Sequence, residues 1–105
     1  MATDKTYIQF VIEQLRGENA AYKKMFGEYM VYVDEKPIFT VCDNTVFVKE
    51  VKELDEIMSE ADRGYPYDGA KEHYILDIEN VELVEKTVGI LKQVIPVPKK
   101  KIKKS

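Results

Sequence analysis

Residues 28–49 read EYMVYVDEKPIFTVCDNTVFVK, and this stretch decides the fold of the chain. It contains three runs that are rich in β-branched and aromatic residues, a composition typical of strands: 28–33, 37–42 and 45–49. Polar residues 34–36 separate the first two runs. Asp43 and Asn44, which tolerate positive φ, separate the second and third runs. The stretch therefore predicts a three-stranded antiparallel meander joined by tight turns.

An amphipathic helix is expected before the meander, over residues 4–16. Its apolar residues recur at the spacing of one helical face: Ile8, Val11, Ile12 and Leu15. Thr3 or Asp4 can cap the first turn by accepting a hydrogen bond from a free amide, and Gly17 is expected to end the helix. Residues 22–26 are compatible either with an extension of the first strand or with a short separate strand, and the sequence leaves both open.

Two further helices and one further strand are expected after the meander. Residues 50–62 carry apolar side chains at helical spacing and charged side chains on the other face, which is typical of a surface helix. Residues 63–69, RGYPYDG, contain three breakers and predict a loop. Residues 73–78, HYILDI, predict a strand. The last helix is expected over residues 81–95, with Asn80 as its cap.

This order of elements, α-β-β-β-α-β(β)-α, predicts an α+β domain. We expect a two-layer sandwich, in which helices cover one face of an antiparallel sheet of four to five strands. A chain of 105 residues has room for one domain with one core. Residues 1–98 are expected to form that domain. The lysine-rich residues 99–105 are expected to be a disordered tail, because like charges repel and nothing there can build a core.

The composition restricts the compartment in which the chain works. A single cysteine, Cys42, cannot form an intrachain disulfide, which indicates a reducing environment. Residues 1–7 lack the charged and then apolar pattern of a signal peptide. No apolar run approaches the roughly 20 residues that are needed to span a bilayer. We therefore expect a cytoplasmic protein that is neither secreted nor embedded in a membrane.

Charge is distributed unevenly along the chain. Five of the 16 basic residues are Lys99, Lys100, Lys101, Lys103 and Lys104. The remaining 11 basic residues stand against 19 acidic ones, so residues 1–98 carry a net charge of −8 and the tail carries +5. The five lysines are candidate contacts for weak nucleic-acid binding by counterion release. A tail that only increases solubility is the favoured alternative, because no aromatic residues are interleaved to read bases.

Motifs for catalysis are missing from the sequence. Cys42 and His73 are the one conceivable nucleophile–base pair, since a cysteine nucleophile needs a nearby imidazole to stabilise its thiolate. We favour the alternative that Cys42 is a small apolar residue of a strand. The sequence contains neither the GxGxxG nor the GxxxxGK[ST] phosphate-binding pattern, and no calcium loop. We predict a protein that is not an enzyme and that holds no cofactor, metal or small-molecule substrate.

Strand alternation gives the first run of the meander two apolar sides. Tyr29, Val31 and Val33 fall on one side, and Met30 and Tyr32 fall on the other. One side is expected to pack against helices, and the other would meet a partner or another copy of the protein. The competing interpretation is a core with ordinary exposed aromatic residues, because much of any protein surface is apolar. The sequence leaves both interpretations open.

Several stretches resemble the N-terminal domain of the TfoX family of competence regulators. They are residues 24–29 (KMFGEY), 41–44 (VCDN) followed by 46–49 (VFVK), 65–71 (YPYDGAK), and a last helix followed by Pro-x-Pro and lysines. The similarity extends from about Tyr7 to Lys101. It implies a cytoplasmic bacterial protein with a two-layer fold similar to that of type III secretion chaperones. We expect a stand-alone domain, without the C-terminal domain of full-length regulators that resembles helix-hairpin-helix modules.

The resemblance supplies no catalytic residue, but it marks candidate signature and interaction residues. They are Met25, Phe26, Gly27, Glu28, Tyr29, Tyr32, Tyr67, Gly69 and Lys71. Gly27 is expected to permit a bulge, Gly69 a turn with positive φ, and Lys71 is a candidate partner for Glu28. The predicted function is a non-catalytic protein-interaction module, which self-associates or docks a regulatory partner. The alternative is an accessory nucleic-acid-binding protein that acts through its basic tail.

Overall fold

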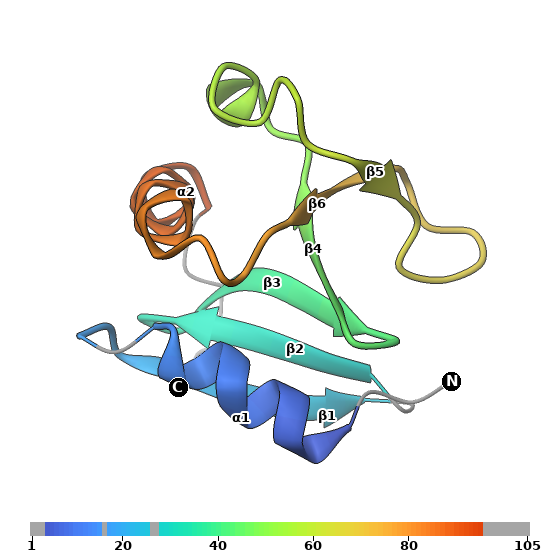
Figure 1. The fold of residues 1–105 in the computed structure, drawn as a ribbon, viewed down its shortest axis with the longest axis vertical. Helices are drawn as coiled ribbons and strands as arrows, with labels where there is room; N and C mark the ends of the chain where they lie inside the picture. Colours follow the sequence, from blue (N-terminus) through green and yellow to red (C-terminus); the bar gives the residue numbers. More distant parts are fainter. Residues whose placement is uncertain (1–3, 16, 26–27, 96–105) are drawn as a thin grey trace, which may run out of the picture.

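The computed structural model describes residues 4–15, 17–25 and 28–95 (Figure 1). It confirms an α+β fold, with one six-stranded sheet and two α-helices among these residues. The elements are α1 (Lys5–Glu13), β1 (Ala20–Met25), β2 (Glu28–Val33), β3 (Lys36–Cys42), β4 (Thr45–Lys49), the 3₁₀ turn η1 (Lys52–Leu54), β5 (Arg63–Gly64), β6 (His73–Leu76) and α2 (Val81–Val94).

The predicted meander is confirmed as β2, β3 and β4. The sheet has the order β1-β2-β3-β4-β6-β5, and every neighbouring pair is antiparallel. Asp34 and Glu35 have φ values of 53° and 68°, and Asp43 and Asn44 both have 55°. Positive φ at both central residues is what tight hairpins of the mirror-image type require, because their twist matches that of the strands. Local turn chemistry therefore fixes the register of the central sheet.

The sheet has six strands instead of the predicted four to five. Residues 20–25 form a strand of their own, β1, which settles the alternative that the sequence left open. Residues 63 and 64, predicted as part of a loop, form the short edge strand β5 by pairing with β6. A Cβ atom on Gly64 would lie 3.3 Å from Cδ1 of Ile75 and 3.4 Å from Cε1 of Phe47. Glycine therefore allows the backbone of β5 to approach these side chains closely.

The helix predicted over residues 50–62 is wrong. This segment forms the 3₁₀ turn η1 followed by a series of turns. Leu54 and Met58 are nevertheless buried, so the periodicity identified correctly which side chains face the core. Its backbone hydrogen bonds change spacing: Met58 N–H donates to the carbonyl of Leu54, whereas Ala61 N–H donates to that of Met58. An apolar stripe indicates which side chains are buried. A series of turns can bury the same side chains without the continuous hydrogen bonds of an α-helix.

Both α-helices lie where the sequence places them, although their ends differ. α1 begins after Asp4, whose side chain makes no capping hydrogen bond; its backbone N–H instead donates to Oδ1 of Asn44 at 3.0 Å. The other capping candidate, Thr3, lies outside the described residues. Gly17 follows α1 with a φ of 90°, as expected for a helix stop. Asn80 caps α2 as predicted, since its Oδ1 accepts from Leu83 N–H at 3.1 Å.

The core lies between the helices and one face of the sheet. α1 lies against β1, whereas α2 lies beside β3 and η1 (Figure 1). The buried apolar residues of the helices are Ile8, Val11, Val84, Val88 and Leu91, joined by Leu15 in the turn after α1. Those of the sheet include Tyr29, Val31, Val33, Val41, Val46, Val48, Tyr74 and Leu76. Thr87 also points into this core, and its buried hydroxyl has no hydrogen-bond partner among the described residues. Burial of an unsatisfied hydroxyl lowers stability.

A cluster of charged residues joins the C-terminal end of α2 to the loops below it. The ammonium group of Lys92 lies 2.9 Å from a carboxylate oxygen of Glu18 and 3.5 Å from one of Asp34. The ammonium group of Lys36 donates to the backbone carbonyl of Lys92. The hydrogen bond to Glu18 raises the pKa of Lys92, assisted by the charge of Asp34. The cluster ties α2 to the segment before β1 and to the β2–β3 turn.

Candidate interaction surface

The side of the sheet that faces away from the helices is called the open face here. Residues directly opposite one another in the register share a face, and alternation along each strand places their neighbours on the other face. The open face comprises Glu28, Met30, Tyr32, Thr40, Cys42, Thr45, Phe47, Lys49, His73 and Ile75. The predicted alternation in β2 is confirmed: Tyr29, Val31 and Val33 are buried, whereas Met30 and Tyr32 are half-buried.

The open face carries a small hollow beside Phe47. It has a volume of about 140 Å³ and is lined by Met30, Pro37, Ile38, Thr40, Phe47, Lys49 and His73. Sites for drug-sized ligands are larger, roughly 300–1,000 Å³, so this hollow is matched to a single side chain. Nδ1–H of His73 donates to the carbonyl of Lys71 at 2.7 Å, and the imidazole stands edge-on to the Phe47 ring at 6.4 Å. These contacts fix the orientation of the imidazole at the rim.

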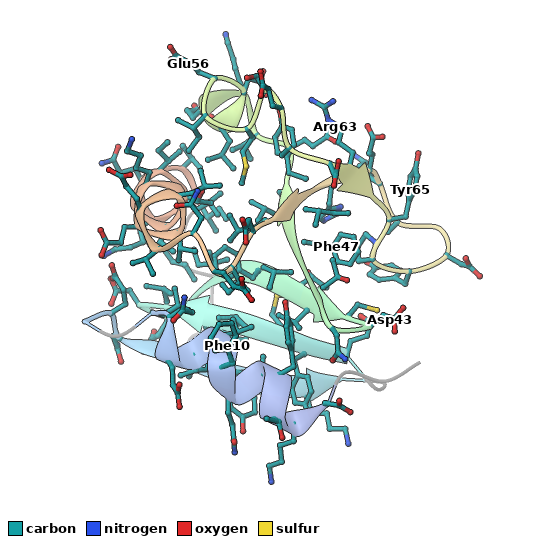
Figure 2. The ribbon with its side chains drawn as sticks, in the orientation of Figure 1. Phe10, Asp43, Phe47, Glu56, Arg63 and Tyr65 are labelled. Carbon is teal, nitrogen blue, oxygen red and sulfur yellow. The ribbon has the colours of Figure 1, made fainter. Side chains whose placement is uncertain are left out.

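Residues 65–70, called the tyrosine loop here, lie between β5 and β6 beside the open face. Tyr65 and Tyr67 are 63% and 54% exposed, whereas Pro66 between them is buried. Gly69 has a φ of 88°, as predicted, and Ala70 N–H closes a turn by donating to the carbonyl of Tyr67 at 3.1 Å. Figure 2 shows Tyr65 extending outward from this loop and Phe47 inside the curve formed by β4, β5 and the loop. The loop is anchored by its proline while it displays both rings to solvent.

The structure does not gather the predicted signature residues into one site. Glu28 and Tyr29 belong to β2, whereas Tyr67, Gly69 and Lys71 lie between the last two strands of the sheet order. Phe26, Gly27 and the five tail lysines Lys99, Lys100, Lys101, Lys103 and Lys104 lie outside the described residues, so the predicted bulge at Gly27 does too. Met25 ends β1.

Two of the signature residues, Tyr29 and Glu28, have contacts that define their surroundings. Tyr29 is buried in the core, and its ring meets that of Tyr22 edge-on at 5.3 Å. Glu28 lies beside Cys42 on the open face, and its carboxylate raises the pKa of the Cys42 thiol. The predicted pairing of Glu28 with Lys71 does not occur among the ion pairs of the described residues. Tyr32, Tyr67 and Lys71 remain accessible, so these three can serve a surface.

The register separates Cys42 from His73. Cys42 lies opposite Thr45 at one end of β4, and His73 lies opposite Lys49 at the other end. Four residues of extended strand span roughly 13 Å, so the imidazole is out of reach of the thiol. Burial raises the pKa of Cys42, and the carboxylates of Glu28 and Asp43 raise it further. This environment disfavours the thiolate, which is the reactive form.

A polar cluster that the sequence analysis missed anchors the segment after β4. The hydroxyl of Tyr74 donates to Oδ1 of Asp55 at 2.8 Å, and the guanidinium of Arg63 lies 4.9 Å from the centre of the Tyr74 ring. Nε of Arg63 also lies 3.3 Å from a carboxylate oxygen of Glu50. Arg63 lowers the pKa of Tyr74, but the hydrogen bond to Asp55 and burial outweigh it, so that pKa is raised overall. No spacing in the sequence indicates these contacts, because they depend on β5 pairing with β6.

A second, larger hollow lies between the turns after η1, β6 and the start of α2. It has a volume of about 590 Å³, and its acidic lining residues are Glu60, Asp62 and Asp77. Within residues 4–15, 17–25 and 28–95, no group of three or more histidine, cysteine or carboxylate side chains could hold a metal ion. Neither described helix has the length and apolar character needed to cross a bilayer.

One comparison with known proteins relates the chain to a bacterial protein. The chain is 33% identical over 102 residues to the "Uncharacterized 12.7 kDa protein in trpE 5'region" of Spirochaeta aurantia. The match covers 94% of this chain and 89% of that protein. No family model matches the chain, and no solved structure matches it. Identity at this level over nearly the full length of both proteins shows common descent, and the chain belongs to the same family as the Spirochaeta aurantia protein.

Proposed function

We propose that this protein is a non-catalytic protein-interaction module of the kind formed by the N-terminal domain of TfoX competence regulators. The observation that carries the proposal is the tyrosine loop, in which Tyr65 and Tyr67 are exposed on either side of the buried Pro66. Tyrosine rings held on an anchored backbone offer a large contact area at low entropic cost, and tyrosine is enriched where proteins bind each other.

The open face supports the same proposal. Its hollow of about 140 Å³ is the size of one side chain and lies beside the tyrosine loop, with Lys49 and His73 among its lining residues. An apolar anchor of a partner would fill the hollow, and Lys49 would meet a polar or acidic neighbour. The surface thus combines an apolar centre with a polar rim, as interfaces do.

The finer architecture and location belong to this proposal as well. Helices on one face of an antiparallel sheet are compatible with the two-layer sandwich expected from type III secretion chaperones. The chain has a single cysteine and so no intrachain disulfide, which suits a reducing compartment. We therefore place the module in the cytoplasm of a bacterium.

Affinity capture tests the proposal. The immobilised protein is exposed to a lysate of its source organism, in parallel with a Tyr65→Ser/Tyr67→Ser variant and a Val81→Ser variant. Val81 is 47% exposed at the start of α2 and serves as the control for loss of an exposed apolar side chain. We expect one or more proteins that are retained by the wild type and by Val81→Ser but not by the double variant. Retention of the same proteins by all three would show that the tyrosine loop does not bind them.

Self-association is tested on the purified protein. Light scattering after gel filtration gives the mass in solution, to be compared with 12.2 kDa for a single chain. If the partner is a second copy, the wild type will show a larger mass that falls to that of a monomer in the double tyrosine variant. A monomer at high concentration would leave only partners of a different sequence.

A second candidate function is accessory nucleic-acid binding through the tail. The specific observation is the run of five lysines in residues 99–105 of an otherwise acidic chain. Counterion release would make such binding weak and strongly dependent on salt. A gel-shift series at low salt, with and without residues 99–105, decides the question. Binding that is absent at low salt, or unchanged after truncation, contradicts this function.

A further inference from the structure

β1 lies at one edge of the sheet. β1 is the first strand in the sheet order, and no described element pairs with its outer side. Asp34 N–H donates to the carbonyl of Asn19 at 3.0 Å, which makes these two residues a hydrogen-bonded pair next to the first pair of the β1–β2 register. Along an antiparallel ladder, hydrogen-bonded pairs alternate with non-hydrogen-bonded pairs, and the backbone groups of the latter point away from the partner strand. The N–H and C=O groups of Tyr22 and Lys24 therefore point outward, away from β2.

The side chains along this edge form a cationic strip. Lys23 and Lys24 are exposed, and neither forms an ion pair with any residue that the structure describes. Residues 20–25, AAYKKM, contain no acidic residue, although the whole chain carries a net charge of −3. The register places Lys24 on the core side opposite Tyr29 and Lys23 on the open face opposite Met30. The two ammonium groups thus stand on opposite sides of the edge.

Resting on the proposed function, we infer that the β1 edge binds an extended, acidic segment of a partner protein by antiparallel strand addition. A strand added there would hydrogen-bond to the outward N–H and C=O groups of Tyr22 and Lys24. Running antiparallel, it would place successive residues opposite Lys24, Lys23 and Tyr22. Two adjacent carboxylates followed by an apolar residue would pair with both ammonium groups and cover the Tyr22 ring, which is 38% exposed.

Charge complementarity distinguishes this partner from the other occupants. A second copy of β1 would bring two more lysines and no carboxylate, and lysines on an edge strand oppose pairing between copies. A nucleic acid would pair with the lysines but would leave the outward peptide groups of Tyr22 and Lys24 without a strand partner. The other edge of the sheet, β5, is only 2 residues long and offers too little backbone for strand addition.

Fluorescence anisotropy with labelled peptides tests the inference on the full chain. The probe carries Glu-Glu-Val within a threonine–valine background, and the control peptide carries Lys-Lys-Val in the same background. We expect the wild type to bind the acidic peptide in a salt-sensitive manner and to bind the basic peptide at least about tenfold more weakly. A Lys23→Glu/Lys24→Glu variant should reverse this preference. Lys52→Glu/Lys86→Glu, which reverses the charge of two exposed lysines on η1 and α2, is the matched charge control and should behave like the wild type.

A backbone variant separates strand addition from simple charge attraction. Tyr22→Pro removes an N–H that points outward, so the β1–β2 ladder keeps its hydrogen bonds while the added strand loses one. Circular dichroism confirms that the variant is folded, and Tyr22→Ala keeps the N–H while it removes the ring. We expect loss of binding in Tyr22→Pro and only a few-fold weakening in Tyr22→Ala.

Three results would overturn the inference. They are equal binding of the acidic and basic peptides, binding that is unaffected by Tyr22→Pro in the folded variant, and a wild-type dimer that Tyr22→Pro dissociates. If the acidic peptide fails to bind but capture of partners still depends on Tyr65 and Tyr67, the edge assignment is wrong and the interaction module stands. If the peptide binds as expected but capture does not depend on the tyrosines, the edge stands and the loop is excluded.

Discussion

At the scale of single residues, environment decides what each reactive or aromatic side chain can do. Tyr29 and Tyr74 are buried, whereas Tyr65 and Tyr67 are exposed, although all four look alike in the sequence. Strand alternation explains Tyr29, because its neighbours in β2 reveal the buried face. Local sequence places Tyr67 in a loop and Tyr74 in a strand, but it does not reveal the contacts of Tyr74, which come from the remote residues Asp55 and Arg63.

The thiol of Cys42 provides a test at this scale. Its pKa is raised by burial and then by Glu28 and Asp43, so at neutral pH the thiolate fraction is smaller than that of an ordinary cysteine. We expect slow reaction with iodoacetamide at neutral pH and a rate that rises only at a more alkaline pH than for free cysteine. Glu28→Gln should shift that profile toward lower pH. A profile that rises below that of free cysteine would contradict the assigned environment and would revive a thiol-based function.

At the scale of elements, local signals were reliable where turns and strands are adjacent. β2, β3 and β4 could be predicted because both connecting turns are encoded by their own residues, Asp34-Glu35 and Asp43-Asn44. The helix predicted over residues 50–62 could not be corrected from the sequence, because turns and a helix can bury the same apolar stripe. β5 could not be predicted either, since its 2 residues form a strand only through β6.

The hydrogen bond between Tyr74 and Asp55 anchors the turns after η1 to β6, and a double-mutant cycle measures it. Tyr74→Phe leaves the ring under Arg63 but removes the hydroxyl, and we expect it to lower the free energy of unfolding by about 1 kcal/mol. Asp55→Ala leaves the Tyr74 hydroxyl unsatisfied, and the two changes together should be less than additive. Urea unfolding gives each value. Full additivity would show that the two groups do not interact.

At the scale of the whole molecule, two accessible regions lie at opposite edges of one sheet. The tyrosine loop adjoins β5 and β6, and the cationic strip runs along β1. The sequence predicted the α+β class and an aromatic sheet, but it could not show that these two regions lie at opposite edges. The strand order depends on the pairing of β4 with β6, and 23 residues lie between Lys49 and His73. The same gap explains why the predicted signature residues are not gathered into one site.

Hydrogen–deuterium exchange of the wild type, alone and with the captured partner, tests the central claim of an interaction module most directly. The account predicts slower amide exchange at residues 63–73, at β1, or at both, with unchanged exchange along α2. Tyr65→Ser/Tyr67→Ser should abolish the protection at residues 63–73. Protection confined to residues 57–62 and the start of α2, where the hollow of about 590 Å³ lies, would contradict the account and would place the function in that acidic groove instead.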